Sequence, residues 1–490
     1  MLATAAYGVA LGLALPRGPV TTAQALTTLT ASFGAGLLAG YLTRSRWAIL
    51  VAPTVFGVVF ELVRVGASGP TVDAVAPTST YGVIALLVGR GFLALLTLSP
   101  LALGATLGAA ATRTGRASPG GRPPARGTRY LRRTVTALLC LGLVLFGVAL
   151  ARPARTAPIP GADGRPLPGS IAELVRVEVG GHELGLMIRG HDVTDPVLLF
   201  LAGGPGGSEL GAMRRHAQGL EEDFVVATFD QRGTGTSHHQ LEPVETMTLK
   251  RAVADVVEVS RYLRDRFDTD RIYLVGQSWG STLGVLAVQD SPALYRAFVG
   301  VGQMVSQRET DRIFRADTLA WARRVGDEAL ARELTAIGPP PYADVLDYET
   351  ALSHEQQVYP YDHGPNSEGA GGFSENLFVE EYTLLEQVHN LGAFLDVFTI
   401  LYPQLQDIDF RRSATRLEVP VYLVQGAFEA RGRAVLADEW FGLLQAPHKQ
   451  LVVLDTSGHR PIFEQPQRFH EVMVGIVLAQ TEGRATPQGG

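Results

Sequence analysis

The chain has 490 residues, of which 46% are hydrophobic and only 18% are charged, and its formal net charge is -6. An acidic balance of this kind disfavours a nucleic-acid partner, and we expect none. The single cysteine, Cys140, lies inside an apolar run, which excludes an internal disulfide and a thiolate metal site. We predict neither a metal nor another cofactor.

Hydrophobic residues are concentrated in the first third of the chain, where four segments are long enough to cross a bilayer as helices of about 20 residues. These segments are residues 24–43, 47–65, 81–103 and 134–151. Residues 1–15 are also apolar but lack the basic start of a cleaved signal peptide. They form either a fifth span or a signal-like segment, and we favour the span. Residues 1–152 are thus predicted to be a transmembrane region of four or five spans in contact with the lipid bilayer.

The arginines between the spans predict the orientation of this region. The loop between the last two spans, residues 112–133, contains no acidic residue, and a second basic turn carries Arg44 and Arg46. The arginines of the loop are Arg113, Arg116, Arg122, Arg126, Arg129, Arg132 and Arg133. Because positively charged short loops stay in the cytoplasm, we predict a cytoplasmic N-terminus and an extracytoplasmic position for everything after residue 152. The protein is expected to be a multi-pass protein of the cell membrane.

A proline-rich linker, residues 153–170, should lead from the membrane into an α/β domain, because proline-rich chain forms neither helices nor sheet ladders. Eight strand-like runs follow it. They are Leu174–Val179, Leu184–Arg189, Pro196–Leu201, Phe224–Phe229, Ile272–Val275, Phe298–Val301, Val419–Gln425 and Leu451–Leu454. Several are continuously apolar, as buried parallel strands are, and helical patterns over Leu249–Phe267, Ser281–Gln289 and Pro466–Ala479 separate the later ones. The pattern predicts a mostly parallel sheet of eight strands.

Residues 303–417 form an excursion between the sixth and seventh strands. Its segments with helical spacing are Asp311–Val325, Asp327–Ile337, Tyr348–Val358 and Glu380–Tyr402. The run Pro339-Pro340-Pro341 and the glycine-rich stretch Gly369–Gly372 interrupt them. A helical insertion at the carboxyl edge of such a sheet is expected to cover the functional site as a cap.

The pentapeptide Gly276-Gln277-Ser278-Trp279-Gly280 lies directly after the fifth strand and before a helix, which is where a nucleophile elbow must lie. The flanking glycines leave room for the sharp turn that raises a serine hydroxyl above the sheet. By itself the pentapeptide is weak, because about 0.2 to 0.3 matches per chain are expected by chance. Ser278 is the candidate nucleophile, and a serine here excludes dehalogenase or epoxide hydrolase chemistry, which would require an aspartate.

Four ordered blocks over about residues 175–480 resemble the α/β-hydrolase-fold serine peptidases of the proline iminopeptidase type. The blocks are Gly276–Ser281, Gly203-Gly204-Pro205-Gly206, Asp230–Gly235, and Ser457-Gly458-His459 with Phe463-Glu464-Gln465-Pro466. The resemblance implies a hydrolase core at residues 171–302 and 418–480 and a helical cap at 303–417. Residues 481–490 are predicted to be a flexible tail, and the transmembrane region lies outside the resemblance.

The chain order of this fold, serine then acid then histidine, implies the partners of Ser278. His459 follows the last strand and would act as the base. The acid would follow the seventh strand, where Glu429 stands at the position of the family's aspartate and is one methylene longer. Asp438 and Asp455 are the alternatives, although Asp438 fits a helix better and Asp455 a turn. Four other histidines are predicted to lie at the surface: His216, His238, His239 and His448.

Acyl transfer also needs two hydrogen-bond donors for the oxyanion. The resemblance implies the backbone N–H groups of Trp279 and Gly204, with Gly203 beside the latter. Ala202 stands where the family usually has a histidine, but backbone donors do not depend on that side chain. A glycine-rich turn could instead reverse the chain or bind phosphate, yet no P-loop lysine follows it.

In proline iminopeptidases, carboxylates of the cap bind the free amino terminus of the peptide. The resemblance gives Glu375, Glu380 and Glu381 as candidates for this role, and the alternative is that they form a solvated helix face. The Asp230–Gly235 block is interpreted as structural, with Asp230 and Arg232 fixing the loop beside the elbow.

The leading interpretation is a membrane-anchored serine hydrolase that releases N-terminal residues from short peptides through a Ser-His-Glu triad and an acyl-enzyme. A second interpretation is an esterase or amidase that uses the same triad on small or lipid-like acyl substrates. A third is a non-catalytic membrane binding protein, and the presence of all three triad residues argues against it. The expected partners are a small peptide or acyl substrate and the lipid bilayer, and the sequence does not predict an oligomeric state.

Overall fold

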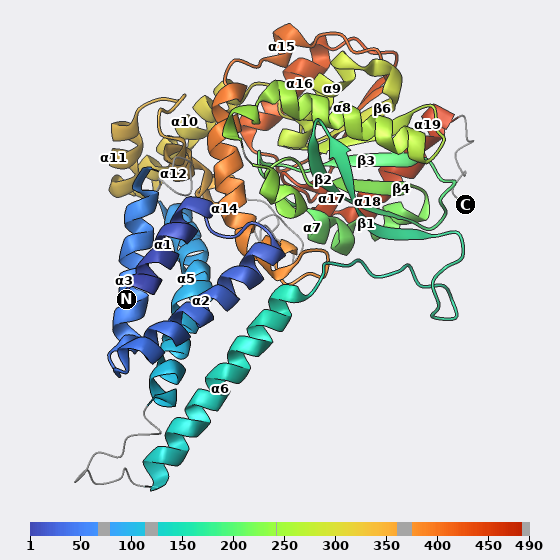
Figure 1. Ribbon diagram of the computed structural model, residues 1–490. Helices are drawn as coiled ribbons and strands as arrows, with labels where there is room; N and C mark the ends of the chain where they lie inside the picture. The colour runs from blue at the N-terminus through green and yellow to red at the C-terminus, as the bar shows by residue number, and fades with distance from the viewer. Residues whose placement is uncertain (67–78, 113–125, 242, 360–374, 483–490) are drawn as a thin grey trace, which may run out of the picture. The chain divides into compact units, whose positions relative to one another are not determined.

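The computed structural model of this chain describes residues 1–66, 79–112, 126–241, 243–359 and 375–482, and it divides into two compact units (Figure 1). The first unit contains Met1–Pro153 and Thr383–Gly392, and the second contains Ala154–Tyr382 and Ala393–Gly490. The Gly369–Gly372 stretch, most of the arginine loop and nearly all of the 481–490 tail lie outside the described residues.

Among the described residues of the first unit, four helices are long and apolar enough to cross a membrane. They are α2 (Thr22–Thr43), α3 (Ala48–Val63), α5 (Thr80–Ala111) and α6 (Arg126–Ala151), and they coincide with the four predicted apolar segments. Helix α1 (Leu2–Ala14) has 13 residues, fewer than the roughly 20 that a transmembrane helix needs. Because α6 begins at Arg126, the last arginines of the predicted loop stand on this helix.

Helices α2 and α5 approach each other closely because glycines face each other at their crossing. Gly36 and Gly40 lie against the backbone of α5, and Gly104 and Gly108 lie against the backbone of α2. A Cβ added at Gly40 would lie 2.0 Å from the carbonyl oxygen of Ala105. In lipid, such close packing stabilises a helix pair, because the hydrophobic effect contributes little between helices there.

The second unit is built on one sheet of eight strands. The strands are β1 (Ile171–Val179), β2 (His182–Gly190), β3 (Val197–Leu201), β4 (Val225–Phe229), β5 (Ile272–Gln277), β6 (Tyr295–Val301), β7 (Val421–Gly426) and β8 (Lys449–Leu454). Their order is β1-β2-β4-β3-β5-β6-β7-β8; β2 runs antiparallel to β1 and β4, and the remaining pairs are parallel. The predicted α/β fold with a mostly parallel sheet is confirmed.

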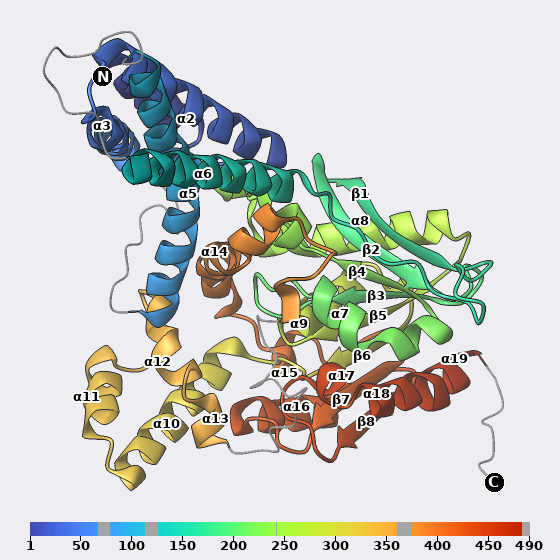
Figure 2. The same cartoon turned by 90° about the horizontal axis from the view of Figure 1, so that it is seen from below.

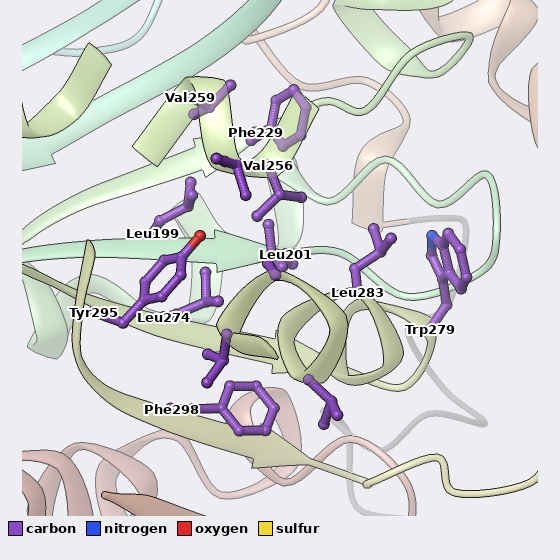
Figure 3. Packing of buried hydrophobic residues seen from close by; sticks show 14 of the residues in the cluster. Leu199, Leu201, Phe229, Val256, Val259, Leu274, Trp279, Leu283, Tyr295 and Phe298 are labelled. Carbon is purple, nitrogen blue, oxygen red and sulfur yellow. The ribbon is translucent and has the colours of Figure 1, made fainter. Parts of the chain in front are cut away.

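Helices cover both faces of this sheet, so its central strands are buried throughout (Figures 1 and 2). One face packs against α8 (Leu249–Arg266), α9 (Trp279–Asp290) and α16 (Arg431–Leu443). Figure 3 shows this cluster, with Leu199, Phe229 and Phe298 from the strands and Val256 and Leu283 from the helices. The other face packs against α7 (Leu210–His216), α17 (Pro461–Glu464) and α18 (Pro466–Val472), which a π-helix, Met473–Leu478, and α19 (Ala479–Glu482) follow.

The predicted helical insertion lies between β6 and β7. Its described helices are α10 (Gln307–Val325), α11 (Glu328–Ile337), α12 (Tyr348–Leu352), α13 (Glu355–Val358), α14 (Leu384–Leu401) and α15 (Phe410–Ser413). Several predicted segments differ from the structure. Helix α10 begins at Gln307 instead of Asp311. The segment Tyr348–Val358 forms two short helices, and α14 begins at Leu384 instead of Glu380. The later start has a physical reason, because Thr383 and Glu386 hydrogen-bond each other's backbone N–H groups at 3.3 and 2.7 Å and cap the helix there.

We predict that Gly40→Ala destabilises the first unit by about 1–3 kcal/mol, because the added methyl group overlaps the backbone of α5. Gly34→Ala on the same helix is the matched control, since a Cβ at Gly34 has no neighbour within 4 Å. Thermal unfolding of the detergent-solubilised chain should give a lower Tm for Gly40→Ala and an unchanged or slightly higher Tm for Gly34→Ala. Equal Tm values for the two variants would contradict the proposed close crossing.

Candidate active site

Ser278 stands in the sharp turn between β5 and α9. Its backbone has φ 53° and ψ -119°, a conformation that residues other than glycine rarely adopt. Gly276 and Gly280 make the turn sterically feasible. A Cβ at Gly276 would lie 2.2 Å from the carbonyl oxygen of Gly280, and one at Gly280 would lie 2.1 Å from that of Leu201. This is the geometry of a nucleophile elbow. Residues with strained backbone conformations of this kind are found most often at functional sites.

Three side chains from different strand ends form a continuous hydrogen-bonded chain. Ser278 Oγ lies 2.9 Å from His459 Nε2, and His459 Nδ1 lies 2.7 Å from Glu429 Oε2. Ser278 follows β5, Glu429 follows β7 and His459 follows β8, and the carboxyl ends of these parallel strands meet at one edge of the sheet. The structure thus brings together the three residues that the sequence assigned to a triad.

The two alternative acids occupy other positions. Asp438 is exposed on α16. Asp455 is exposed after β8 and accepts a hydrogen bond from Gln465 Nε2 at 3.0 Å. Glu429, in contrast, is buried and touches the imidazole, so it has the geometry that an orienting acid requires.

Glu429 is held by Arg433 as well as by His459. Arg433 Nε donates to Glu429 Oε1 at 2.7 Å, and the backbone N–H of Ala430 donates to the same oxygen at 2.8 Å. Burial by itself would raise the pKa of this carboxyl, but the positive charges of Arg433 and His459 outweigh it and lower the pKa of Glu429 to about 2. The carboxylate is therefore ionised at neutral pH and stabilises positive charge on the imidazole.

The glycine loop after β3 runs beside Ser278. A Cβ at Gly203 would lie 3.4 Å from Ser278 Cβ, and Gly204 has φ 127°, a region that favours glycine. Trp279 is the first residue of α9, where backbone N–H groups have no acceptor within the helix. The backbone of Trp279 and the loop that carries Gly204 therefore both border the serine. The Trp279 side chain is buried and donates to Gln231 Oε1 at 2.8 Å, which is a packing role.

The block after His459 holds the histidine loop in place. Glu464 Oε2 accepts from the backbone N–H of Gly458 at 2.5 Å, and Gln465 Oε1 accepts from Ser457 Oγ at 2.7 Å. Within the elbow, Gln277 Nε2 donates to the carbonyl oxygen of His459 at 3.3 Å. The matched motif thus has a structural purpose, which is to fix the loop that carries the histidine.

A second cluster of buried charges surrounds Arg460, the residue that follows the histidine. Arg460 Nη2 lies 3.2 Å from Glu209 Oε1, and its Nη1 lies 3.4 Å from Glu375 Oε2. Glu375 Oε1 lies 2.5 Å from His216 Nε2, and the N–H of Gly203 donates to Glu209 Oε2 at 3.4 Å. Burial raises the pKa of Glu209 despite Arg460, whereas for Glu375 the hydrogen bond from His216 and the charge of Arg460 outweigh burial and lower the pKa.

The other two predicted cap carboxylates also face arginines. Glu380 accepts two hydrogen bonds from Arg155, at 3.0 and 2.8 Å. Glu381 is buried, with Oε1 3.9 Å from Arg214 Nε. Of the three carboxylates, only Glu375 belongs to the cluster around Arg460, next to the histidine loop.

Two of the four histidines predicted at the surface are buried, which corrects that prediction. His216 ends α7, a helix that the sequence patterns did not indicate, and its ring packs against Glu375 and Phe463. His238 is buried, with Nδ1 3.1 Å from the carbonyl oxygen of Gly235. His239 is partly buried and His448 is exposed.

The Asp230–Gly235 block makes the contacts of a structural element. Arg232 forms a buried two-point ion pair with Asp255, at 3.0 Å for each contact. Asp230 Oδ2 accepts from the backbone N–H of Thr236 at 2.8 Å and so closes the turn.

Sequence reasoning missed residues that contact Glu429 and His459 or lie beside them. Arg433, in the first turn of α16, follows Glu429 by four residues, and that spacing was the available signal. Gly302, directly after β6, has φ 56°, and a Cβ there would lie 2.8 Å from His459 Nδ1. Arg460 gave no signal of its own, because its partners come from distant parts of the sequence. Among the described residues, no group of three His, Cys, Asp or Glu side chains could hold a metal ion.

Residues 196–466 match the alpha/beta hydrolase fold family, and the chain belongs to that family. It is similar to the probable aminopeptidase YbaC of Bacillus subtilis (strain 168), with 27% identity over 311 residues that cover 61% of this chain and 94% of the relative. It is also similar to the proline iminopeptidase of Xanthomonas citri, with 26% identity over 296 residues that cover 59% of this chain and 88% of the relative.

Among solved structures, the chain resembles a proline iminopeptidase-related protein from Thermus thermophilus. The TM-score is 0.44 at 20% identity, over 65% of this chain and 99% of that one. The family and the names of the two sequence relatives support a hydrolase.

Proposed function

We propose that this protein is a membrane-anchored serine hydrolase of the proline iminopeptidase type, which releases N-terminal residues from short peptides. The observation that carries the proposal is the hydrogen-bonded chain from Ser278 Oγ through His459 to Glu429, with distances of 2.9 and 2.7 Å. A serine hydroxyl is a poor nucleophile until a base takes its proton, and this chain supplies the base and the group that orients it.

In the proposed reaction, Ser278 Oγ bonds to the substrate carbonyl carbon while its proton passes to His459 Nε2. The histidine gives that proton to the leaving amine as the C–N bond breaks, which leaves an acyl-enzyme on Ser278. A water then attacks the ester carbonyl and gives its proton to His459. The bond to Ser278 Oγ breaks, the histidine returns the proton to that oxygen, and the carboxylic acid product leaves.

The negative charge that develops on the substrate oxygen needs fixed donors beside the nucleophile. The backbone N–H groups of Trp279 and Gly204 are proposed for this role. Their support is that Trp279 begins α9 next to the serine and that the Gly203–Gly206 loop borders Ser278 Cβ.

A second candidate, an esterase or amidase on small or lipid-like acyl substrates, is favoured by one observation. Glu375, the proposed amine ligand beside the histidine loop, is already paired with Arg460 and His216. Glu380 and Glu381 likewise face Arg155 and Arg214. A carboxylate that is neutralised in this way attracts a substrate ammonium group weakly.

We predict that a fluorophosphonate probe labels the intact protein and fails to label Ser278→Ala, because the bond forms at Ser278 Oγ. His459→Ala should react more slowly by roughly 10³-fold, since no base then takes the proton. Gel fluorescence after timed incubation measures both rates. Asp455→Asn is the control and should react as the natural chain does. Equal labelling of the natural chain and the three variants would refute the proposed triad.

A substrate panel separates the two candidate functions. For the aminopeptidase we expect hydrolysis of aminoacyl arylamides with a free amino group, and at least about 10-fold lower kcat/KM for their N-acetylated forms. Glu375→Gln should then raise KM for the free-amine substrates only. Faster hydrolysis of acyl esters, with no preference for a free amine and no effect of Glu375→Gln on that preference, would select the esterase or amidase.

We further propose that the hydrolase unit is extracytoplasmic, on the basis of the seven arginines between residues 112 and 133. The single cysteine allows a clean test, because Cys140→Ala yields a chain without thiols. In that background, a membrane-impermeant maleimide should label Val193→Cys on intact cells, since Val193 is 41% exposed. Ser118→Cys, in the arginine loop, should react only after permeabilisation, and the reverse pattern would invert the topology.

A further inference from the structure

We propose that Arg433 is a positioning residue that holds the Glu429 carboxylate against His459, and that the helical cap in turn holds Arg433. The proposal rests on the serine hydrolase function proposed above. It identifies a residue that neither the elbow, the glycine loop nor the histidine block contains.

The guanidinium of Arg433 bridges the acid and two cap helices. Its Nε lies 2.7 Å from Glu429 Oε1, and its Nη2 forms an ion pair with Glu355 of α13. Its central carbon lies 4.9 Å from the ring centre of Phe314 on α10, within the range of a cation–π contact. Arg433 is only 6% exposed, so these contacts are screened little by solvent.

The two carboxylate oxygens of Glu429 contact different partners, and this explains why the acid needs Arg433 as well as His459. Oε1 accepts from Arg433 and from the Ala430 backbone, whereas Oε2 faces His459 Nδ1. A glutamate has one more rotatable bond than an aspartate, and each free torsion allows the carboxylate to turn away from the imidazole. Arg433 on one oxygen fixes the direction of the other, which is the preorganisation that an orienting acid requires.

An ordinary helix ion pair does not account for this contact. Pairs four residues apart on a helix surface are solvated and contribute little. Here the side chains of Arg433 and Glu429 are 6% and 1% exposed, and the carboxylate is shared with a histidine that contacts the nucleophile. Without Arg433, the buried Glu429 carboxylate would keep two of the contacts described above. These are the Ala430 backbone N–H and the imidazole of His459.

Other charged or titratable groups lie near Arg433 and His459. Near Arg433 they are Glu355 on α13, Asp311 and Asp317 on α10, Arg431 on α16 and Tyr359 after α13. In the histidine loop, Glu464 accepts from the backbone N–H groups of Gly458 and Arg460, on either side of His459. Removal of the Arg433 charge lets the imidazole hold its proton more tightly, because a nearby positive charge is lost. Removal of the Glu355 charge has the opposite effect, because Arg433 is then less neutralised.

The test measures the rate of labelling by an alkyl fluorophosphonate as a function of pH, with the full-length chain in detergent. This rate falls at acidic pH, where His459 is protonated and cannot act as a base. We expect Arg433→Met to move this acidic limb upward by about one pH unit and to lower the plateau rate by roughly 10-fold. Glu355→Gln should move the limb downward, and Arg433→Lys should keep it nearer to that of the natural chain.

Arg431→Met is the matched control, because Arg431 lies on the same helix, is exposed and pairs with Asp317 at 2.8 and 2.5 Å. Its limb should move much less than that of Arg433→Met, because solvent screens the exposed ion pair between Arg431 and Asp317. The proposal would be overturned if the acidic limb lay at the same pH in Arg433→Met and Arg431→Met. It would also be overturned if the limb of Glu355→Gln moved to higher pH. If Arg433→Met does not fold, the directions for Arg433→Lys and Glu355→Gln decide. Persistent labelling of Ser278→Ala would instead refute the proposed serine hydrolase function. That outcome is distinct from the results that would refute the role of Arg433 alone.

Discussion

At Ser278 the backbone passes from β5 into α9 through a single residue with φ 53°, a conformation that costs on the order of 1–3 kcal/mol. The surrounding structure enforces it. The Ser278 N–H donates to the carbonyl oxygen of Val301 at 2.9 Å, and the next residue, Trp279, is buried in the core. The neighbouring loops approach this turn closely at glycines, which have no side chain to obstruct the contact. Gly203 borders Ser278, and Gly302 borders the imidazole of His459.

The buried arginines of the hydrolase unit give the site its second constraint. Among the described residues of that unit they are Arg189, Arg232, Arg433 and Arg460, and each lies against a buried carboxylate. Such pairs add little net stability, because both charges lose their hydration, but a misplaced partner would be costly. The pairs therefore specify geometry. Arg232 and Asp255 fix the loop beside the elbow, whereas Arg433 and Arg460 lie next to the acid and the histidine.

Most of the fold could be predicted because its signals are local. Several strands are continuous apolar runs between turn residues, and glycines flank Ser278 at the predicted elbow. Ser278 and His459 could be named because each follows a predicted strand within a matched block, and Glu429 because it follows the seventh strand at the position of the family's aspartate. The supporting charges could not be named in this way. Arg460 meets Glu209 and Glu375 across 251 and 85 residues of sequence, and no periodic pattern links them. The burial of His216 escaped prediction for the same reason, because Glu375 is its partner from 159 residues away.

The charges around Arg460 bear on the proposed recognition of a substrate amine by Glu375. Burial raises the pKa of Glu209 and so favours its neutral form, whereas Glu375 is the carboxylate with the lowered pKa. Arg460 lies against both carboxylates, and the hydrogen bond from His216 occupies the other oxygen of Glu375. A substrate ammonium group would therefore meet carboxylates whose charge Arg460 already offsets in part. The proposed recognition of a free amino terminus by Glu375 would thus require this cluster to rearrange, whereas recognition of an uncharged acyl substrate would not.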